Sequence, residues 1–227
     1  MNMLADTLSE TLQHLENAAK DAHRPPPALL AVSKLQPASA VAELARAGQR
    51  AFGENYVQEA QAKIGELGGM ELEWHLIGHL QSNKADLAAH LFDWVQTVDR
   101  HKLIGALSRN RPADRPPLNV LIQVNIDDEA SKHGCRPEEI DALADAIADA
   151  PNLRLRGLMA IPAPHEDAAL RTAAFTRMQA LQQALAARHA GVDTLSMGMS
   201  GDFAQAIAHG ATMVRIGTAL FGARPAP

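Results

Sequence analysis

One strand–helix–strand unit begins with Leu29-Leu30-Ala31-Val32-Ser33-Lys34, continues through a helix-forming stretch at Ala38–Ala47 and ends with a second short apolar run at Arg50–Gly53. Pro37 precedes the helical stretch and Gly48 follows it, and these residue types commonly start and stop a helix. Short strands that alternate with helices in this way are typical of parallel βα units. The stretch therefore predicts an α/β fold with a parallel sheet.

The same alternation continues along the rest of the chain. Stretches rich in Ala, Leu, Glu and Gln, such as Glu138–Ala150 and Asp167–His189, separate further short apolar runs. The predicted strands are Leu29–Lys34, Arg50–Gly53, Trp74–Gly78, Asp93–Val98, Asn119–Asn125, Leu155–Ile161, Thr194–Gly198 and Met213–Gly217. Eight parallel βα units close a (β/α)₈, or TIM, barrel. We therefore predict a single α/β barrel, with an open doubly wound sheet as the alternative.

The chain has 227 residues, which matches the usual size of one α/β barrel. No Ser/Gly-rich linker divides it, so we expect a single domain over residues 1–227. At the start of the chain, Leu4, Leu8, Leu12 and Leu15 recur at helical spacing with charged residues between them. This pattern predicts an extra amphipathic helix over residues 3–22 that packs on the core.

Charge and composition exclude several classes of function. The formal net charge is −5, so the sequence lacks a uniform basic footprint for nucleic acid. No run approaches the roughly 18 uninterrupted apolar residues of a membrane span, and the first helix does not resemble a secretory signal. Cys135 is the only cysteine, which excludes an intrachain disulfide and a cysteine-based zinc site. We expect a cytoplasmic protein that contacts neither nucleic acid nor membrane.

Lys34 is the first candidate for chemistry. In barrels of this kind the functional side chains lie at the carboxyl ends of the strands, and Lys34 ends the first apolar run. A partly desolvated lysine can lose its proton near neutral pH and form a Schiff base with an aldehyde. A solvated lysine at the end of a strand is the alternative interpretation.

Polar residues also follow the second strand and occupy the third. Glu54 and Asn55 either point into the mouth of the barrel or begin the next helix. His75 and His79 are four residues apart, but Gly78 argues against a continuous helix between them, and a metal site usually needs a third protein ligand. We predict that His75 is an interior histidine, that His79 lies at the edge of the site, and that no metal is bound.

Small residues follow the seventh and eighth strands. The seventh leads into Met199-Ser200-Gly201-Asp202 and then a helix, and the eighth leads into Gly217-Thr218. Small residues let backbone N–H groups approach a ligand, and a helix N-terminus favours an anion. Barrel phosphate sites are commonly built from these two loops, to which Arg215 would add a charge. The two turns predict a phosphate site, with ordinary turn glycines as the alternative.

A strand-end lysine facing a phosphate site suits pyridoxal 5'-phosphate, which carries both an aldehyde and a phosphate. With these features the chain resembles the pyridoxal phosphate homeostasis proteins from near residue 30 to near residue 223. The stretches that carry the resemblance are Ala31-Val32-Ser33-Lys34, Phe52-Gly53-Glu54-Asn55-Tyr56, Trp74-His75, Ile77-Gly78-His79-Leu80-Gln81-Ser82-Asn83-Lys84, Arg156-Gly157-Leu158-Met159, Leu195-Ser196-Met197-Gly198-Met199-Ser200 and Val214-Arg215-Ile216-Gly217.

The resemblance implies a fold-type III barrel, similar to the N-terminal domain of alanine racemase, with pyridoxal 5'-phosphate as its cofactor. It also implies a Schiff base on Lys34. The other implied contacts are Ser200, Arg215, Gly217 and Thr218 around the phosphate and ring, and Asn55, His79 and Met199 along the walls of the pocket. The sequence leaves open whether Arg215 faces the phosphate or the ring nitrogen.

A further stretch that matches the family follows the fifth strand, as Asp127-Asp128-Glu129-Ala130-Ser131-Lys132-His133-Gly134. Lys132 in this stretch is a candidate for a second, weaker lysine near the mouth, or else an ordinary loop charge. The partners that the resemblance suggests are the cofactor itself and apo forms of enzymes that use it. We expect a monomer.

The chain differs from racemases of this fold type, which add a β-rich domain that supplies a catalytic tyrosine. This sequence ends at Pro227, and its one tyrosine is Tyr56. We therefore expect a carrier that holds the cofactor on Lys34 and supplies or buffers it in the cell, without catalytic residues. The alternatives are a weak amino-acid racemase that uses the same cofactor, and a cofactor-free aldolase that forms its Schiff base on Lys34.

Overall fold

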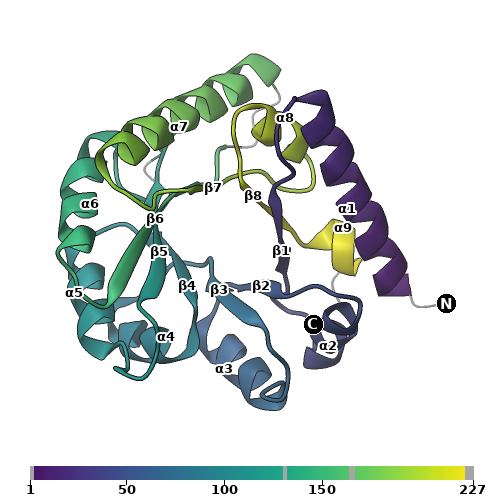
Figure 1. Cartoon of the computed structure of the whole chain (residues 1–227), viewed down its shortest axis with the longest axis horizontal. Helices are drawn as coiled ribbons and strands as arrows, with labels where there is room; N and C mark the ends of the chain where they lie inside the picture. The colour runs from purple at the N-terminus through teal and green to yellow at the C-terminus, as the bar shows by residue number, and fades with distance from the viewer. Residues whose placement is uncertain (1–2, 130–131, 164–166, 223–227) are drawn as a thin grey trace.

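A computed structural model describes residues 3–129, 132–163 and 167–222. Figure 1 looks into a ring of strands that helices surround on the outside. Of the stretches considered above, Ala130-Ser131 and the end of the chain at Pro227 lie outside the described residues. Within the described residues, no helix combines the length and the apolar character needed to cross a bilayer.

Eight parallel strands form a closed barrel in sequence order, because β8 pairs with β1 as well as with β7. The strands are β1 (Ala28–Val32), β2 (Ala51–Glu54), β3 (Glu73–Leu76), β4 (Trp94–Val98), β5 (Leu118–Val124), β6 (Leu153–Ala160), β7 (Thr194–Ser196) and β8 (Met213–Ile216). This closure confirms the predicted (β/α)₈ barrel, and the open sheet is excluded.

Helices follow the strands and form the outer layer (Figure 1). They are α1 (Met3–Asp21), α2 (Ala38–Arg46), α3 (Val57–Glu66), α4 (Ala85–Leu91), α5 (His101–Asn110), α6 (Ile140–Ala148), α7 (Ala168–Arg188), α8 (Phe203–Ala208) and α9 (Thr218–Phe221). Because helices cover the strands from outside and side chains fill the inside, β4 is buried at every position.

The helix α1 lies outside the ring, alongside α8 and α9 (Figure 1). Its residues Leu8, Leu15 and Ala19 are buried, whereas Met3 and Leu12 are largely exposed. Leu8 and Leu15 of the predicted apolar stripe therefore face the barrel, as expected for an amphipathic helix, whereas Leu12 does not. The predicted N-terminal helix is confirmed to within one residue at its end.

Six strands end before the residue that the sequence predicts. β1 ends at Val32, β3 at Leu76, β5 at Val124, β6 at Ala160, β7 at Ser196 and β8 at Ile216. Lys34 and Gly217 consequently lie in loops just past the strands. These loops belong to the carboxyl end of the barrel, where active sites of this fold are found.

Candidate functional site

A cavity of about 210 Å³ opens among the loops that follow the strands. Ligand pockets commonly measure about 300–1,000 Å³, so this cavity suits a small ligand. Seven of the eight expected contacts line it: Lys34, Asn55, Met199, Ser200, Arg215, Gly217 and Thr218. The remaining lining residues, which the sequence did not single out, are Val32, Gln36, Ile77, Ile161 and Gly222.

The backbone on both sides of Lys34 is held by side chains from α3. Lys63 donates a hydrogen bond from Nζ to the carbonyl oxygen of Ser33 at 2.7 Å. On the other side, the N–H of Leu35 donates to Oε1 of Glu59 at 2.5 Å. Leu35 has φ +61°, a conformation that residues other than glycine rarely adopt. These contacts fix the half-buried Lys34 at the edge of the cavity.

Glu54, Glu59 and Lys63, together with the hydroxyl of Ser33, form what we call the α3 ion cluster. Lys63 Nζ lies 2.7 Å from Oε1 of Glu54 and 2.7 Å from Oε1 of Glu59. The Ser33 hydroxyl donates to Glu54 at 2.6 Å. Burial raises the pKa of Glu54, which is fully buried, although the bond from Lys63 opposes the shift.

Glu54 therefore takes neither of the two positions that the sequence suggested. It does not line the cavity, and the N-cap residue of α3 is Tyr56, with no side-chain hydrogen bond at the cap. Its carboxylate points toward Lys63 instead. Lys63 escaped sequence analysis because it lies in a polar helical stretch, where a lysine usually faces solvent.

Arg215 lies in β8 and is only 4% exposed. Its guanidinium donates from NH1 to Oγ of Ser196 at 2.8 Å and from NH2 to the carbonyl oxygen of Ala160 at 2.9 Å. Burial lowers the pKa of Arg215 to about 10, and Asp202 partly opposes this shift. The side chain thus remains a cation at neutral pH, at the floor of the cavity.

The turn after β7 depends on Gly198. Its φ is +95°, and a Cβ atom there would lie 2.6 Å from Cβ of Ala206, so a larger residue would clash. The turn brings the exposed residues Met199 and Ser200 to the cavity. The carboxylate of Asp202 accepts a hydrogen bond from the Met199 N–H at 2.6 Å, which shapes the turn.

The turn after β8 supplies the facing part of the rim. Gly217 is partly exposed and Thr218 is exposed, and both line the cavity. The two rim turns therefore meet beside Arg215, which lies below them on β8. The predicted juxtaposition of small-residue turns with Lys34 is present in the structure.

Asn55 lies where the loops after β2 and β3 touch. A Cβ atom on Gly78 would approach the carbonyl oxygen of Asn55 to 2.1 Å, so the close contact requires glycine. Asn55 lines the main cavity and also two adjoining hollows, of about 360 and 280 Å³. It therefore connects the cavity to the rest of the barrel mouth.

His79 lines the two adjoining hollows and is absent from the lining of the main cavity. Its ring stacks on that of His133, with centroids 3.7 Å apart. Burial, followed by the charge of His133, lowers the pKa of His79. With Asp99, the two histidines bring three candidate metal ligands within 4.8 Å.

Lys132 borders the 280 Å³ hollow. Its ammonium group lies 3.4 Å from a carboxylate oxygen of Glu129 and 3.9 Å from one of Asp127. Both acidic groups come from its own loop. Lys132 is thus near the mouth, as predicted, but it lines a different hollow from Lys34.

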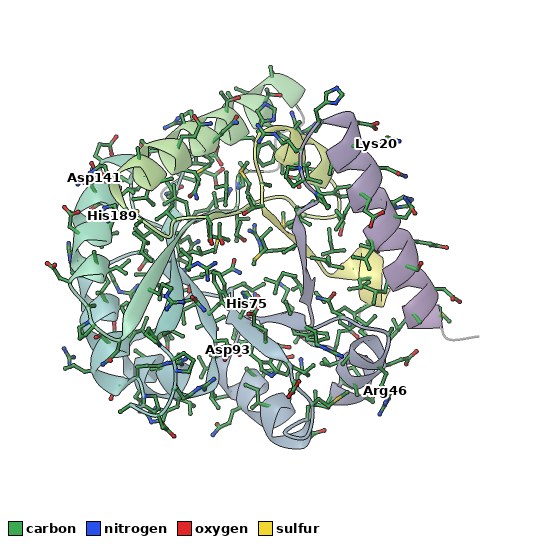
Figure 2. All side chains as sticks on the ribbon, in the orientation of Figure 1. Lys20, Arg46, His75, Asp93, Asp141 and His189 are labelled. Atoms are coloured by element: carbon green, nitrogen blue, oxygen red, sulfur yellow. The ribbon has the colours of Figure 1, made fainter. Side chains whose placement is uncertain are left out.

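His75 lies inside the barrel, as predicted and as Figure 2 shows. It is fully buried and stacks on Trp94, with ring centroids 5.1 Å apart. Burial lowers its pKa, so the neutral imidazole is favoured. Its hydrogen-bond partners are Glu73 and Gln96, which no motif in the sequence marks.

Comparison with known proteins identifies the relatives of this chain. Residues 7–225 match the family model for the N-terminal domain of alanine racemase. The pyridoxal phosphate homeostasis protein of Pseudomonas aeruginosa is 53% identical over 226 residues, which cover 99% of this chain and 97% of that protein. The chain belongs to the pyridoxal phosphate homeostasis protein family. The protein of that name from Escherichia coli K12 is also 53% identical, with 99% and 98% coverage.

Solved structures agree with this family. PipY of Synechococcus elongatus, in a structure without PLP, has a TM-score of 0.87 and 38% identity, and the match covers 96% of this chain and all of PipY. PipY with PLP bound has a TM-score of 0.83 and 36% identity over 96% and 100% of the two chains. Alanine racemase from Corynebacterium glutamicum shares the fold at 20% identity and a TM-score of 0.70, over 97% of this chain and 62% of the racemase.

Proposed function

We propose that this protein binds pyridoxal 5'-phosphate (PLP) in the 210 Å³ cavity and acts in PLP homeostasis. One observation carries the proposal: a half-buried lysine, a buried arginine and two small-residue turns line the same small cavity. The aldehyde, the ring nitrogen and the phosphate of PLP match these three features. The PLP-bound structure of PipY and the names of the curated relatives support the same ligand.

Lys34 is the residue that we propose to hold PLP covalently. PLP supplies an aldehyde that condenses with an amine. With PLP bound, the Nζ atom of Lys34 would hold it by condensing with the aldehyde with loss of water, a link that hydrolysis would reverse. The α3 ion cluster supports this role, because it fixes the backbone on both sides of Lys34.

Exposure distinguishes the phosphate end of the cavity from the ring end. Ser200 and Thr218 are exposed, whereas Arg215 is 4% exposed. A phosphate dianion is strongly hydrated and loses less by binding at the exposed rim. We therefore assign the phosphate to Ser200, Gly217 and Thr218. Arg215 then faces the ring nitrogen, donates a hydrogen bond to it and keeps it unprotonated.

Asn55 and Met199 complete the proposed PLP contacts as walls of the cavity. His79 stays a prediction for the outer edge, since it lines the adjoining hollows. Tyr56, the only tyrosine, is 60% exposed and lines the 360 Å³ hollow rather than the cavity of Lys34. This placement supports a carrier without a second acid–base residue beside the cofactor.

Visible absorption of the purified protein tests the proposal. After addition of PLP and removal of the unbound cofactor by gel filtration, the wild type is expected to retain a yellow band that borohydride removes. Lys34→Ala and Lys34→Arg should lack the band, since neither replacement offers an amine that condenses with an aldehyde. Lys20→Ala, on the outer face of α1 (Figure 2), is the matched control and should retain it. A colourless wild-type protein would contradict the proposal and favour the cofactor-free aldolase.

Chiral chromatography separates a carrier from a weak racemase. The protein, loaded with PLP, is incubated with single L-amino acids, and the D-enantiomers are measured. We expect turnover well below about 1 per second, the lower end of ordinary enzymatic rates. Turnover at or above that rate would establish an enzyme.

We also propose that the protein delivers PLP to apo-enzymes, as a monomer of one domain in the cytoplasm. The open rim, where Ser200 and Thr218 are exposed, supports exchange of the ligand. Mixing the loaded protein with an apo-enzyme that requires PLP tests delivery. We expect the apo-enzyme to regain activity faster with the loaded protein than with free PLP alone. The free PLP in the control is set to the concentration that the loaded protein releases by itself.

A further inference from the structure

A continuous chain of hydrogen bonds crosses the inside of the barrel and ends on Arg215. Arg215 donates to Oγ of Ser196 at 2.8 Å, and the Ser196 hydroxyl donates to Oε1 of Gln96 at 2.7 Å. Gln96 Nε2 lies 2.9 Å from Nδ1 of His75, and His75 Nε2 lies 2.8 Å from Oε1 of Glu73. We call Glu73, His75, Gln96 and Ser196 the barrel relay.

The relay spans the barrel rather than one strand pair. Arg215 belongs to β8, Ser196 to β7, Gln96 to β4, and His75 with Glu73 to β3. β4 and β7 are not neighbours in the sheet, so the bond between Gln96 and Ser196 crosses the interior. Glu73 begins β3, at the end of the barrel opposite the cavity. The relay therefore connects the floor of the cavity to the far end of the barrel.

Every hydrogen bond of the relay runs in the same direction. The amide nitrogen of Gln96 can only donate, so Nδ1 of His75 accepts. Nε2 of His75 then carries the proton and donates to the carboxylate of Glu73. The reverse orientation of the Gln96 amide would require a proton on Nδ1 and leave the Nε2 lone pair facing that carboxylate. Because burial lowers the pKa of His75 and favours the neutral ring, the orientation in the structure is the one that satisfies both ends.

The surroundings make this arrangement stable. His75, Gln96 and Ser196 are completely buried, whereas the side chain of Glu73 is 46% exposed. The relay lies between the cation of Arg215, which donates to Ser196, and the carboxylate of Glu73, which is its last member. In a low-dielectric interior, hydrogen bonds in such a chain polarise one another and strengthen.

We propose that the barrel relay positions Arg215 toward the ring of the bound cofactor, so that Glu73 influences the cofactor from the opposite end of the barrel. The inference rests on the proposed binding of PLP. Ser196 and the carbonyl oxygen of Ala160 fix the guanidinium, and the orientation of the Ser196 hydroxyl is set through Gln96 and His75 by Glu73. The relay residues are positioning residues, because none of them lines the cavity.

Two readouts test the inference on the full chain. The first is the dissociation constant for PLP from absorption titrations. The second is the ¹⁵N NMR signal of PLP labelled at the ring nitrogen, which reports the hydrogen bond at that atom directly. Arg215→Met provides the signal expected when the guanidinium is absent.

Ser196→Ala removes the hydroxyl that contacts Arg215. We expect about tenfold weaker PLP binding, in keeping with the loss of one hydrogen bond to a charged group, and a ¹⁵N signal displaced toward that of Arg215→Met. Ser196→Thr retains a hydroxyl and should restore both values toward the wild type. If Ser196→Ala displaces the ¹⁵N signal and Ser196→Thr does not restore it, the effect comes from packing. That result would contradict the proposed role of the relay.

Glu73→Gln is the sharper test, because this half-exposed side chain lies far from the cavity. We expect about two- to tenfold weaker binding and a ¹⁵N displacement of the same sign. Glu71→Gln is the matched control, since Glu71 is exposed and outside the relay, and it should leave both readouts unchanged. Unaltered readouts in folded Glu73→Gln would overturn the inference. Failure of the wild type to bind PLP would instead refute the proposed function.

Discussion

The two ends of the cavity are held by buried polar networks of different kinds. At the Lys34 end, the α3 ion cluster packs two carboxylates around one ammonium group outside the barrel, and it holds backbone. At the Arg215 end, the barrel relay runs through the uncharged interior side chains of Ser196, Gln96 and His75 before it reaches Glu73, and it holds the guanidinium group of Arg215. The α3 ion cluster therefore fixes the backbone beside Lys34, the proposed attachment point of PLP, whereas the barrel relay orients the side chain of Arg215, the proposed contact to the ring.

The networks should also differ in how strongly the fold depends on them. Removing one partner of a buried ion pair leaves an uncompensated charge. Removing one member of a neutral chain leaves only unpaired dipoles. The stability of the fold should therefore depend more on the α3 ion cluster than on the barrel relay.

The largest effect is expected from Lys63→Met. The side chain of Lys63 is 7% exposed, and its loss leaves the buried Glu54 without a cation. The free energy of unfolding should fall by about 3–5 kcal/mol, measured by urea denaturation. The double variant Lys63→Met/Glu54→Leu should recover most of this loss, because an apolar pair of similar volume can replace a buried ion pair. A loss below about 1 kcal/mol for Lys63→Met would contradict the account of the ion cluster.

Gln96→Leu should have a smaller effect on stability. The substitution interrupts the relay and leaves Ser196 and His75 without their buried partner. We expect a loss of about 1–3 kcal/mol in the same denaturation experiment. Should Gln96→Leu destabilise the fold more than Lys63→Met, the proposed difference between the two networks would be wrong.

The titration of His75 should change the free energy of unfolding with pH, by less than the two substitutions above. Burial lowers its folded-state pKa below the ordinary value of 6.5, although Glu73 and Asp93 oppose the shift. Arg156 lies over Trp94, the ring on which His75 stacks. Between the folded-state pKa and pH 6.5 the unfolded chain binds the extra proton, so stability falls as the pH decreases through this window. The slope from one proton is at most about 1.4 kcal/mol per pH unit.

His75→Gln removes that titrating group and should flatten the decline. Urea denaturation of both proteins between pH 7 and pH 5 measures the difference. Parallel curves for wild type and variant would show that His75 does not titrate in this window, and that the relay is insensitive to protonation there.

The sequence predicted the barrel because strand and helix patterns alternate strongly, and Lys34 could be found because it follows the first strand. The two networks could not be found in the same way. Strands of a parallel barrel are buried on both faces, so the sequence does not show whether Gln96 or Glu54 points inward or toward a helix. The positions of Lys63 and Ser196 in the networks depend on contacts between segments that are distant in the chain.

The difference is visible within a single strand. The sequence predicted that His75 is an interior histidine, since it lies in an apolar run, and the structure confirms it. The partners of His75 come from one residue of its own strand and from Gln96 of β4. Hydrogen bonds between side chains of neighbouring strands depend on the register of those strands. The register is set by closure of the barrel, so a local sequence pattern does not predict it.

The central claim is that Lys34 holds PLP, and peptide mass spectrometry tests it most directly. The protein is loaded with PLP, reduced with borohydride and digested, and the position of the reduced adduct is read from the fragment masses. The account predicts one adduct, on Lys34. An adduct chiefly on another lysine, such as Lys132, or none at all would contradict it.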